Sequence, residues 1–214
     1  MIEIIKSAAA EISIDPKEVA VYLGYYSANG IDPKIIDECI AEVSACASYK
    51  ACFAKVPVTS EGSIDIGCLK ACGKSLQKNL EGCDFAYVLA ATTGFEVQRL
   101  IERNSVISPL KGLVTDCAGS AAIEAFCDKI NSALDCSDFL RPRFSPGYGD
   151  LPIECQKGIT EFLNTSKNIG LSLTDSLMMT PVKSVTAIIG IGKEKNECTG
   201  PGCMVCRKTD CPYR

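Results

Sequence analysis

The sequence predicts a domain of the α+β class, because predicted helices come first and a mixture of strands and helices follows. Its 214 residues are 47% hydrophobic and 22% charged, so the chain can bury a core and lacks the composition of a disordered protein. One domain is expected over residues 1–192. A separate short tail is expected over residues 193–214, where hydrophobic residues become scarce and cysteines cluster.

Helices are predicted at several places along the chain. Asp15-Pro16 and Asp32-Pro33 each combine a capping aspartate with a proline suited to the first helical position. Apolar residues at helical spacing then predict a helix from Lys34 to Ala47. Further helices are expected over 75–80, 95–103, 109–134 and 152–163, of which the long one after Pro109 has apolar residues along one side.

Strands are predicted between these helices. Residues 51–58 resemble a strand, with 63–66 as a possible hairpin partner across Glu61-Gly62. Residues 84–91 form a continuous apolar run, which is typical of a central strand buried on both faces. A strand is possible over 169–173, and residues 183–191 alternate as a strand does.

The composition excludes several classes of function. Histidine is absent, which excludes Ser-His-Asp and Cys-His catalysis and any histidine-ligated metal. The net charge of -4 argues against a nucleic-acid partner. Because the chain has no run of about 18 apolar residues and no secretory signal pattern at its start, we expect a cytoplasmic protein without a membrane span.

Four of the 14 cysteines lie close together in the tail, at Cys198, Cys203, Cys206 and Cys211. Glycine and proline between them permit tight turns, and four thiolates suit either a structural zinc or an iron–sulfur cluster. The spacing of the first three also matches part of a plant-type ferredoxin pattern. The tail is therefore predicted to bind a metal, with a loose tail of reduced thiols as the alternative.

The remaining ten cysteines are scattered, and a free cysteine usually behaves as a small buried hydrophobe. We expect them to fill the core. The alternative is a second metal cluster built from Cys39, Cys46 and Cys52.

The segment from Arg141 to Leu151 contains two prolines and two glycines, which predicts a structured loop. Arg143 offers a planar cation for a carboxylate or phosphate. Pro146 restricts the backbone, Gly147 lets a ligand approach it, and Tyr148 adds a ring and a hydroxyl group. The alternative is a tight turn in which Arg143 forms a salt bridge.

This loop, Arg-Phe-Ser-Pro-Gly-Tyr, resembles the Arg-Pro-x-Pro-Gly-Tyr loop that binds S-adenosylmethionine (AdoMet) in the activation domain of cobalamin-dependent methionine synthase. Residues 120–126 resemble the family's Ala-Glu-Ala-Phe helix. Residues 170–185 resemble its Gly-x-x-Leu-Thr-Glu-Ser stretch and the Ser-Val strand that follows, and residues 82–94 resemble stand-alone members. The likeness is good over about 80–192, and it implies a bent, mainly antiparallel sheet flanked by helices.

The resemblance also implies roles for individual residues. Arg143 stands four residues before Gly147, as the family's AdoMet-binding arginine does, whereas its rival Arg141 is out of register. Tyr148 corresponds to a tyrosine beside AdoMet and the corrin ring. Glu124 corresponds to an acidic residue of the AdoMet site, although it could instead be a solvated surface glutamate.

The chain departs from the family in two ways. The cysteine tail replaces a tyrosine-bearing hairpin that helps to hold AdoMet, and no cobalamin-binding motif is possible without histidine. The resemblance therefore implies a stand-alone protein that uses AdoMet to reactivate a cobalamin carried by a methionine synthase or another corrinoid protein. Flavodoxin or ferredoxin is the expected electron donor. The alternatives are an iron–sulfur electron carrier and a non-catalytic module that docks on a corrinoid protein.

Overall fold

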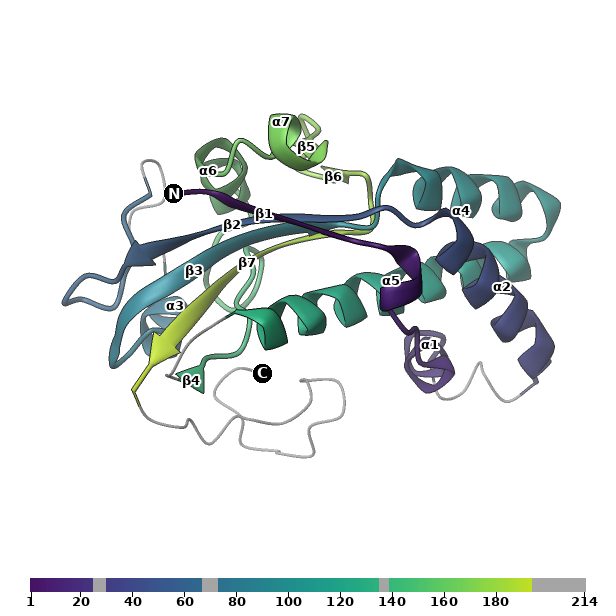
Figure 1. The fold of residues 1–214 in the computed structure, drawn as a ribbon, viewed down its shortest axis with the longest axis horizontal. Helices are drawn as coiled ribbons and strands as arrows, with labels where there is room; N and C mark the ends of the chain where they lie inside the picture. The colour runs from purple at the N-terminus through teal and green to yellow at the C-terminus, as the bar shows by residue number, and fades with distance from the viewer. Residues whose placement is uncertain (25–29, 67–72, 135–138, 194–214) are drawn as a thin grey trace.

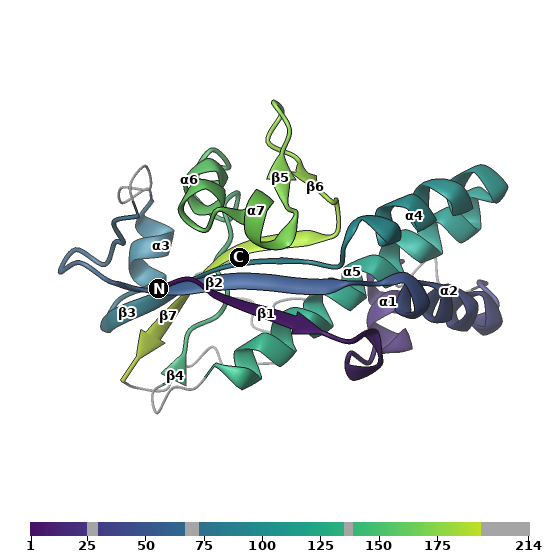
Figure 2. The same ribbon diagram turned by 45° about the horizontal axis from the view of Figure 1, so that its top comes forward.

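The computed structural model describes residues 1–24, 30–66, 73–134 and 139–193. Its centre is a curved antiparallel sheet with the strand order β1-β2-β3-β7-β4 (Figures 1 and 2). The strands span Glu3–Ser7 (β1), Tyr49–Pro57 (β2), Cys83–Thr92 (β3), Phe139–Leu140 (β4) and Ser184–Gly192 (β7). The predicted α+β class and the bent antiparallel sheet flanked by helices are confirmed.

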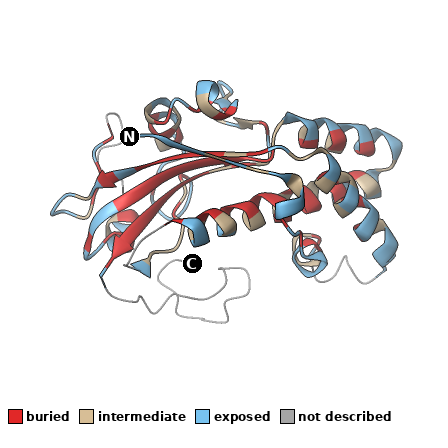
Figure 3. Ribbon diagram, in the orientation of Figure 1, coloured by how far each residue is buried: buried red, intermediate tan, exposed pale blue. Residues whose placement is uncertain are grey.

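Both faces of the sheet are buried at its central strands, and alternate residues of β2, β3 and β7 point into different cores. On β2, Tyr49, Ala51 and Phe53 belong to one core, whereas Cys52 and Ala54 belong to the other. Strand β3 alternates in the same way, and this explains why its sequence is apolar without interruption. Figure 3 shows the central strands as almost entirely buried.

Four helices cover one side and one end of the sheet. They are α1 (Pro16–Tyr22), α2 (Pro33–Cys46), α4 (Phe95–Ile107) and α5 (Pro109–Ala133). Helix α5 crosses one face of the sheet and contacts the other three helices as well (Figure 1). The predicted caps are present, since the carboxylates of Asp15 and Asp32 accept hydrogen bonds from the backbone N–H groups of Lys17 and Lys34 at 2.8 Å and 3.0 Å.

The opposite face of the sheet is covered by α6 (Cys155–Phe162) and α7 (Thr165–Ile169). A two-stranded ribbon of β5 (Ser172–Leu173) and β6 (Met179–Thr180) lies next to them (Figure 2). Helix α3 (Lys74–Asn79) lies at the end of the sheet where β7 finishes, and a short 3-10 helix spans Ala9–Glu11. Within the described residues, no helix is both long and apolar enough to cross a membrane.

Two strand predictions need correction, and three strands, β1, β4 and β6, were missed. Residues 63–66 form no continuous strand, because Ile64 and Asp65 make only isolated bridges, of which that of Ile64 is antiparallel to Val58. The expected strand over 169–173 is instead the end of α7 followed by the short β5. Strand β1 was not predicted because it lies at the sheet edge, where Ile2 and Ile4 remain exposed and no clear alternation marks a buried face.

Candidate functional site

The predicted ligand-binding loop is held against the sheet by β7. Phe144 and Ile188 exchange two backbone hydrogen bonds, of 2.9 Å and 2.8 Å, and the ring of Phe144 is buried in the core beneath α6 and α7. In an extended segment, successive side chains point to opposite sides. Arg143 therefore points towards α5, on the other side of the sheet from Phe144.

Arg143 meets two carboxylates on α5. Its Nη2 donates to Glu124 Oε2 and its Nη1 donates to Asp128 Oδ1, both at 2.7 Å. The two acids lie four residues apart, so they share one face of the helix. The structure thus brings together Arg143 and Glu124, which the resemblance assigned to one site, and it places them in direct contact with each other.

These contacts change the electrostatics of Arg143. Burial alone would lower the pKa of the guanidinium, but the neighbouring sulfur of Cys127 and the carboxylates of Glu124 and Asp128 outweigh it and raise the pKa. Arg143 therefore remains a cation. A guanidinium carries five N–H donors, so the bonds to Glu124 and Asp128 leave donors with which it could bind a ligand's carboxylate.

Helix α1 adds two side chains that sequence reasoning missed, Glu18 and Tyr22. The pKa of Glu18 is raised by partial burial and by the nearby carboxylates of Asp128, Asp15 and Glu124. The pKa of Tyr22 is raised to about 12 by burial and by Glu124 and Glu18. These effects place α1 beside the Arg143 cluster, which we define as Glu18, Tyr22, Glu124, Asp128 and Arg143.

The Arg143 cluster is strongly acidic. Glu124 and Asp128 bind the guanidinium and Glu18 lies near these two acids, so the three carboxylates and one guanidinium have a formal charge of -2 when all four groups are ionised. Only the position of α1 against α5 reveals the acidic character of this cluster, because Glu18 is more than a hundred residues from Glu124 and Asp128 in the sequence. The sequence signal that could have pointed to this acidic cluster is the helical spacing of Glu18 and Tyr22, which places both on one side of α1.

The turn after Arg143 is compact. Tyr148 N donates to Ser145 O, Gly147 N donates to Leu151 O, and Leu151 N donates to Tyr148 O, at 3.1, 2.9 and 3.0 Å. Pro146 is buried, and Gly147 has a φ of +92°, a conformation that other residues rarely adopt. Tyr148 is 61% exposed. Its ring packs edge-on against Phe144 with a centroid distance of 6.3 Å.

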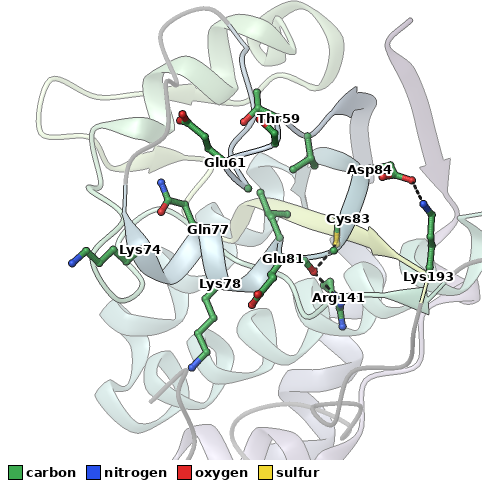
Figure 4. Close-up of a pocket in the computed structure, with 15 residues that line it drawn as sticks. Thr59, Glu61, Lys74, Gln77, Lys78, Glu81, Cys83, Asp84, Arg141 and Lys193 are labelled. Carbon is green, nitrogen blue, oxygen red and sulfur yellow. Dashed lines mark hydrogen bonds and ion pairs between the residues drawn. The ribbon is translucent and has the colours of Figure 1, made fainter.

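A cavity of about 1110 Å³ lies elsewhere, between α3, the turn at 58–62 and the start of β3 (Figure 4). It contains none of the predicted site residues. Its charged side chains have mixed sign, and two of its contacts are Lys193 with Asp84 at 2.6 Å and Arg141 with the carbonyl oxygen of Glu81 at 3.1 Å. Arg141 therefore faces this cavity, whereas Arg143 belongs to the cluster beside α5.

The described cysteines are free thiols, and most are buried. Cys39 lies in the core beneath α5 and Cys52 in the core on the opposite face of the sheet, so they cannot share a metal with Cys46. No group of three or more potential metal ligands occurs in the described ranges. Burial raises the pKa of Cys52 and of Cys127 to about 12. The described buried cysteines are core residues, as expected.

The predicted metal ligands Cys198, Cys203, Cys206 and Cys211 lie outside the described residues, as do Cys68 and Cys72. The metal-binding tail therefore stays a prediction.

Comparisons with known proteins bear on the loop directly. Residues 129–198 match the family model described as "Vitamin B12 dependent methionine synthase, activation domain". The resemblance to this activation domain is confirmed. The matched stretch contains Arg143 and the Pro146-Gly147-Tyr148 turn, whereas Glu124 and α1 precede it.

The fold also matches a solved structure, the MetH reactivation domain bound to AdoHcy, with a TM-score of 0.65 and 13% sequence identity. The alignment covers 92% of this chain and 80% of that one. At this identity, the match shows a shared fold. No curated protein sequence matches the chain.

Proposed function

We propose that the protein binds AdoMet at the Arg143 cluster and presents its methyl group to a cobalamin carried by another protein. The observation that carries the proposal is the pairing of two carboxylates with one arginine beside a proline-glycine-tyrosine turn, with a third carboxylate, Glu18, near those two acids. AdoMet has a cationic sulfonium, a cationic amino group and one carboxylate. An acidic cluster with a single fixed guanidinium is complementary to that pattern of charge.

Each side chain of the cluster then has a part in binding. Arg143 pairs with the ligand's carboxylate through donors not used by Glu124 and Asp128. Glu124 and Glu18 neutralise the amino group and the sulfonium. Gly147 leaves room for the ligand beside the backbone, and Tyr148, whose ring is largely exposed, borders the corrin of the partner.

The chemistry belongs to the bound groups, which is consistent with a chain that lacks histidine. One electron reduces inactive cob(II)alamin to cob(I)alamin, which takes the methyl group of AdoMet and releases S-adenosylhomocysteine (AdoHcy). The irreversible transfer pulls the unfavourable reduction forward. The protein holds the sulfonium over the cobalt and keeps it oriented. The partner is a cobalamin-binding methionine synthase or a related corrinoid protein, and the electron donor is a flavodoxin or ferredoxin.

Calorimetric titration of AdoMet into the full chain tests the proposal. We expect binding by the wild type and a loss of about tenfold or more in Arg143→Ala, because removing a charged hydrogen-bonding group costs about 1.5–3 kcal/mol. Arg141→Ala is the matched control, since Arg141 precedes the same loop but faces the other cavity. Equal affinity of Arg143→Ala and wild type would refute the assignment.

A second titration distinguishes an AdoMet-dependent activator from a docking module. The wild type is mixed with a cobalamin-loaded corrinoid protein and a reductant, with and without AdoMet, and methylcobalamin is followed by its visible spectrum. We expect methylcobalamin only when this protein and AdoMet are both present. Formation of a complex without any AdoMet-dependent methylation would favour the docking alternative.

The cysteine tail is part of the proposal as a metal site. Four thiolates at Cys198, Cys203, Cys206 and Cys211 would hold an iron–sulfur cluster, which could pass on the electron, or a zinc ion, which would be structural. Protein purified without oxygen separates the two, because a cluster absorbs visible light and zinc does not. A metal content of zero in such a sample contradicts both.

A further inference from the structure

The loop that carries Arg143 and Tyr148 is fastened at its far end by Asp150. The backbone N–H of Lys74 donates to Asp150 Oδ2 at 2.7 Å, and that of Ser75 donates to Asp150 Oδ1 at 3.0 Å. Both donors lie in the first turn of α3, where backbone N–H groups have no partner within the helix. Asp150 therefore caps a helix that begins 76 residues earlier in the sequence.

Helix α3 has no cap of its own. The residue before it is Gly73, which offers no side chain, so the carboxylate from the loop takes the place that a local serine or aspartate usually fills. The hydrogen bonds from Ser75 and Lys74 also lower the pKa of Asp150. The contact is thus an ionised carboxylate on two backbone donors, which is stronger than a neutral hydrogen bond.

Two glycines allow the loop and α3 to come this close. A Cβ on Gly73 would lie 2.5 Å from Asp150 Oδ1, and a Cβ on Gly149 would lie 2.7 Å from Ser75 Oγ. Neither distance is possible for a real side chain without movement. The close approach of the loop and α3 therefore requires a glycine on each side of the contact.

Besides the ion pairs of Arg143 and the buried side chain of Leu151, the loop has two hydrogen-bonded anchors. Phe144 joins it to β7 at one end and Asp150 joins it to α3 at the other, with the turn that carries Tyr148 between them. Because the Tyr148 ring is largely exposed, packing against Phe144 alone does little to fix it. The position of Tyr148 depends on the backbone that the two anchors define.

We propose that Asp150 is a positioning residue for the AdoMet site, which acts by fixing the Tyr148 turn to the N-terminal turn of α3. It touches neither AdoMet nor cobalamin. This inference rests on the proposed function for its binding readout, but the order of the turn can be measured without any ligand. Asp32 is a matched control, because it also caps a helix by accepting from a backbone N–H, at 3.0 Å, and its helix α2 carries none of the site residues.

The experiment compares Asp150→Ala and Asp150→Asn with Asp32→Ala. Amide hydrogen exchange is measured in the free proteins, and AdoMet affinity and the unfolding midpoint are measured on the same samples. We expect Asp150→Ala to lose protection at Gly147, Tyr148 and Leu151, and to raise the Kd for AdoMet about five- to tenfold, the size expected for a lost cap. Asp150→Asn keeps one acceptor oxygen and should recover part of both effects.

The control separates positioning from stability. Asp32→Ala should lower the unfolding midpoint about as much as Asp150→Ala while leaving the Kd for AdoMet unchanged. Equal Kd values for Asp150→Ala and wild type, or equal increases in Asp150→Ala and Asp32→Ala, would overturn the inference. If the wild type itself binds no AdoMet, the proposed function fails. Unchanged amide exchange at the Tyr148 turn in Asp150→Ala would separately refute the positioning role of Asp150.

The two glycines give a second test that does not remove the carboxylate. Gly149→Ala places a Cβ against Ser75, whereas Gly170→Ala adds a Cβ at a similarly left-handed position with nothing within 4 Å. Both variants strain the backbone, but only Gly149→Ala should reproduce the weaker AdoMet binding of Asp150→Ala. Equal AdoMet affinities in the two glycine variants would contradict the proposed role of the contact between Asp150 and α3.

Discussion

The two ion pairs of Arg143 are expected to differ in strength, because one arginine contacts two carboxylates of different exposure. The side chain of Arg143 is 19% exposed, that of Glu124 is 36% exposed and that of Asp128 is 63% exposed, while both distances are 2.7 Å. Since exposure to water weakens an ion pair, the two contacts should differ in energy despite their equal length.

Double-mutant cycles measure this difference. The variants are Arg143→Ala, Glu124→Gln, Asp128→Asn and the two double variants that include Arg143→Ala. We expect a coupling energy of about 1–2 kcal/mol between Arg143 and Glu124, as for a partly buried charged hydrogen bond. Between Arg143 and Asp128 we expect about 0.2–1 kcal/mol, as for an exposed pair.

The single substitution Arg143→Ala should lower the free energy of unfolding by more than either coupling energy. It leaves Glu124 and Asp128 without their shared cation and beside Glu18, so that like charges remain in a half-buried site. A loss of roughly 2–3 kcal/mol is reasonable for a partner removed from such a pair. In a domain of this size it should lower the melting temperature by roughly 5–10 °C.

Urea unfolding at pH 7 gives the free energies for all variants, with constant m-values as the check that the states are comparable. A coupling to Asp128 equal to or larger than that to Glu124 would refute the reasoning, because it would mean that burial does not determine the strength of these pairs. A coupling near zero for both would show that Arg143 is held by packing alone.

Two acids should make opposite contributions to the pH dependence of stability. The pKa of Glu18 is raised by burial and by neighbouring carboxylates, so its ionisation opposes folding above that pKa. Glu18→Gln should therefore raise the free energy of unfolding at pH 7, with the gain disappearing below about pH 4.5, where the side chain is protonated in both states. A loss of stability at pH 7 would contradict this. The pKa of Glu42 is lowered by hydrogen bonds from Lys111 and Asn104, at 2.7 Å each, so its contribution is present above about pH 4.5 and lost as the pH falls through the lowered pKa. Glu42→Gln should cost about 1 kcal/mol at pH 7, measured by urea unfolding, and a cost that persists unchanged at pH 3 would show that the carboxylate charge is not involved.

Several parts of the fold could be predicted because their signals are local. Asp15-Pro16 and Asp32-Pro33 cap helices through residues two positions away, and the apolar run at 84–91 identifies a strand buried on both faces. Strand β1 escaped prediction, because an edge strand with exposed apolar side chains lacks the pattern that burial imposes on central strands.

The candidate site, like the fold, has parts that could be predicted from local sequence and parts that could not. The loop that contains Arg143 and Tyr148 is a contiguous segment with stiff and permissive residues at fixed spacing, so its character and its family likeness could be identified from the sequence. The choice of Arg143 over Arg141 followed from register alone, and the two arginines do lie in different surroundings. Whether Arg143 binds AdoMet stays a prediction.

The fold class, the helix starts, the buried strands and the chemistry available in the loop could be predicted from the sequence, because these depend on residues near one another in the chain. The surroundings of that loop depend instead on how distant helices and strands pack together. Glu18 lies near Glu124 and Asp128 because α1 packs on α5, and Asp150 caps a helix formed 76 residues earlier. Contacts between distant segments depend on how whole elements pack, and no local pattern in a single sequence encodes them.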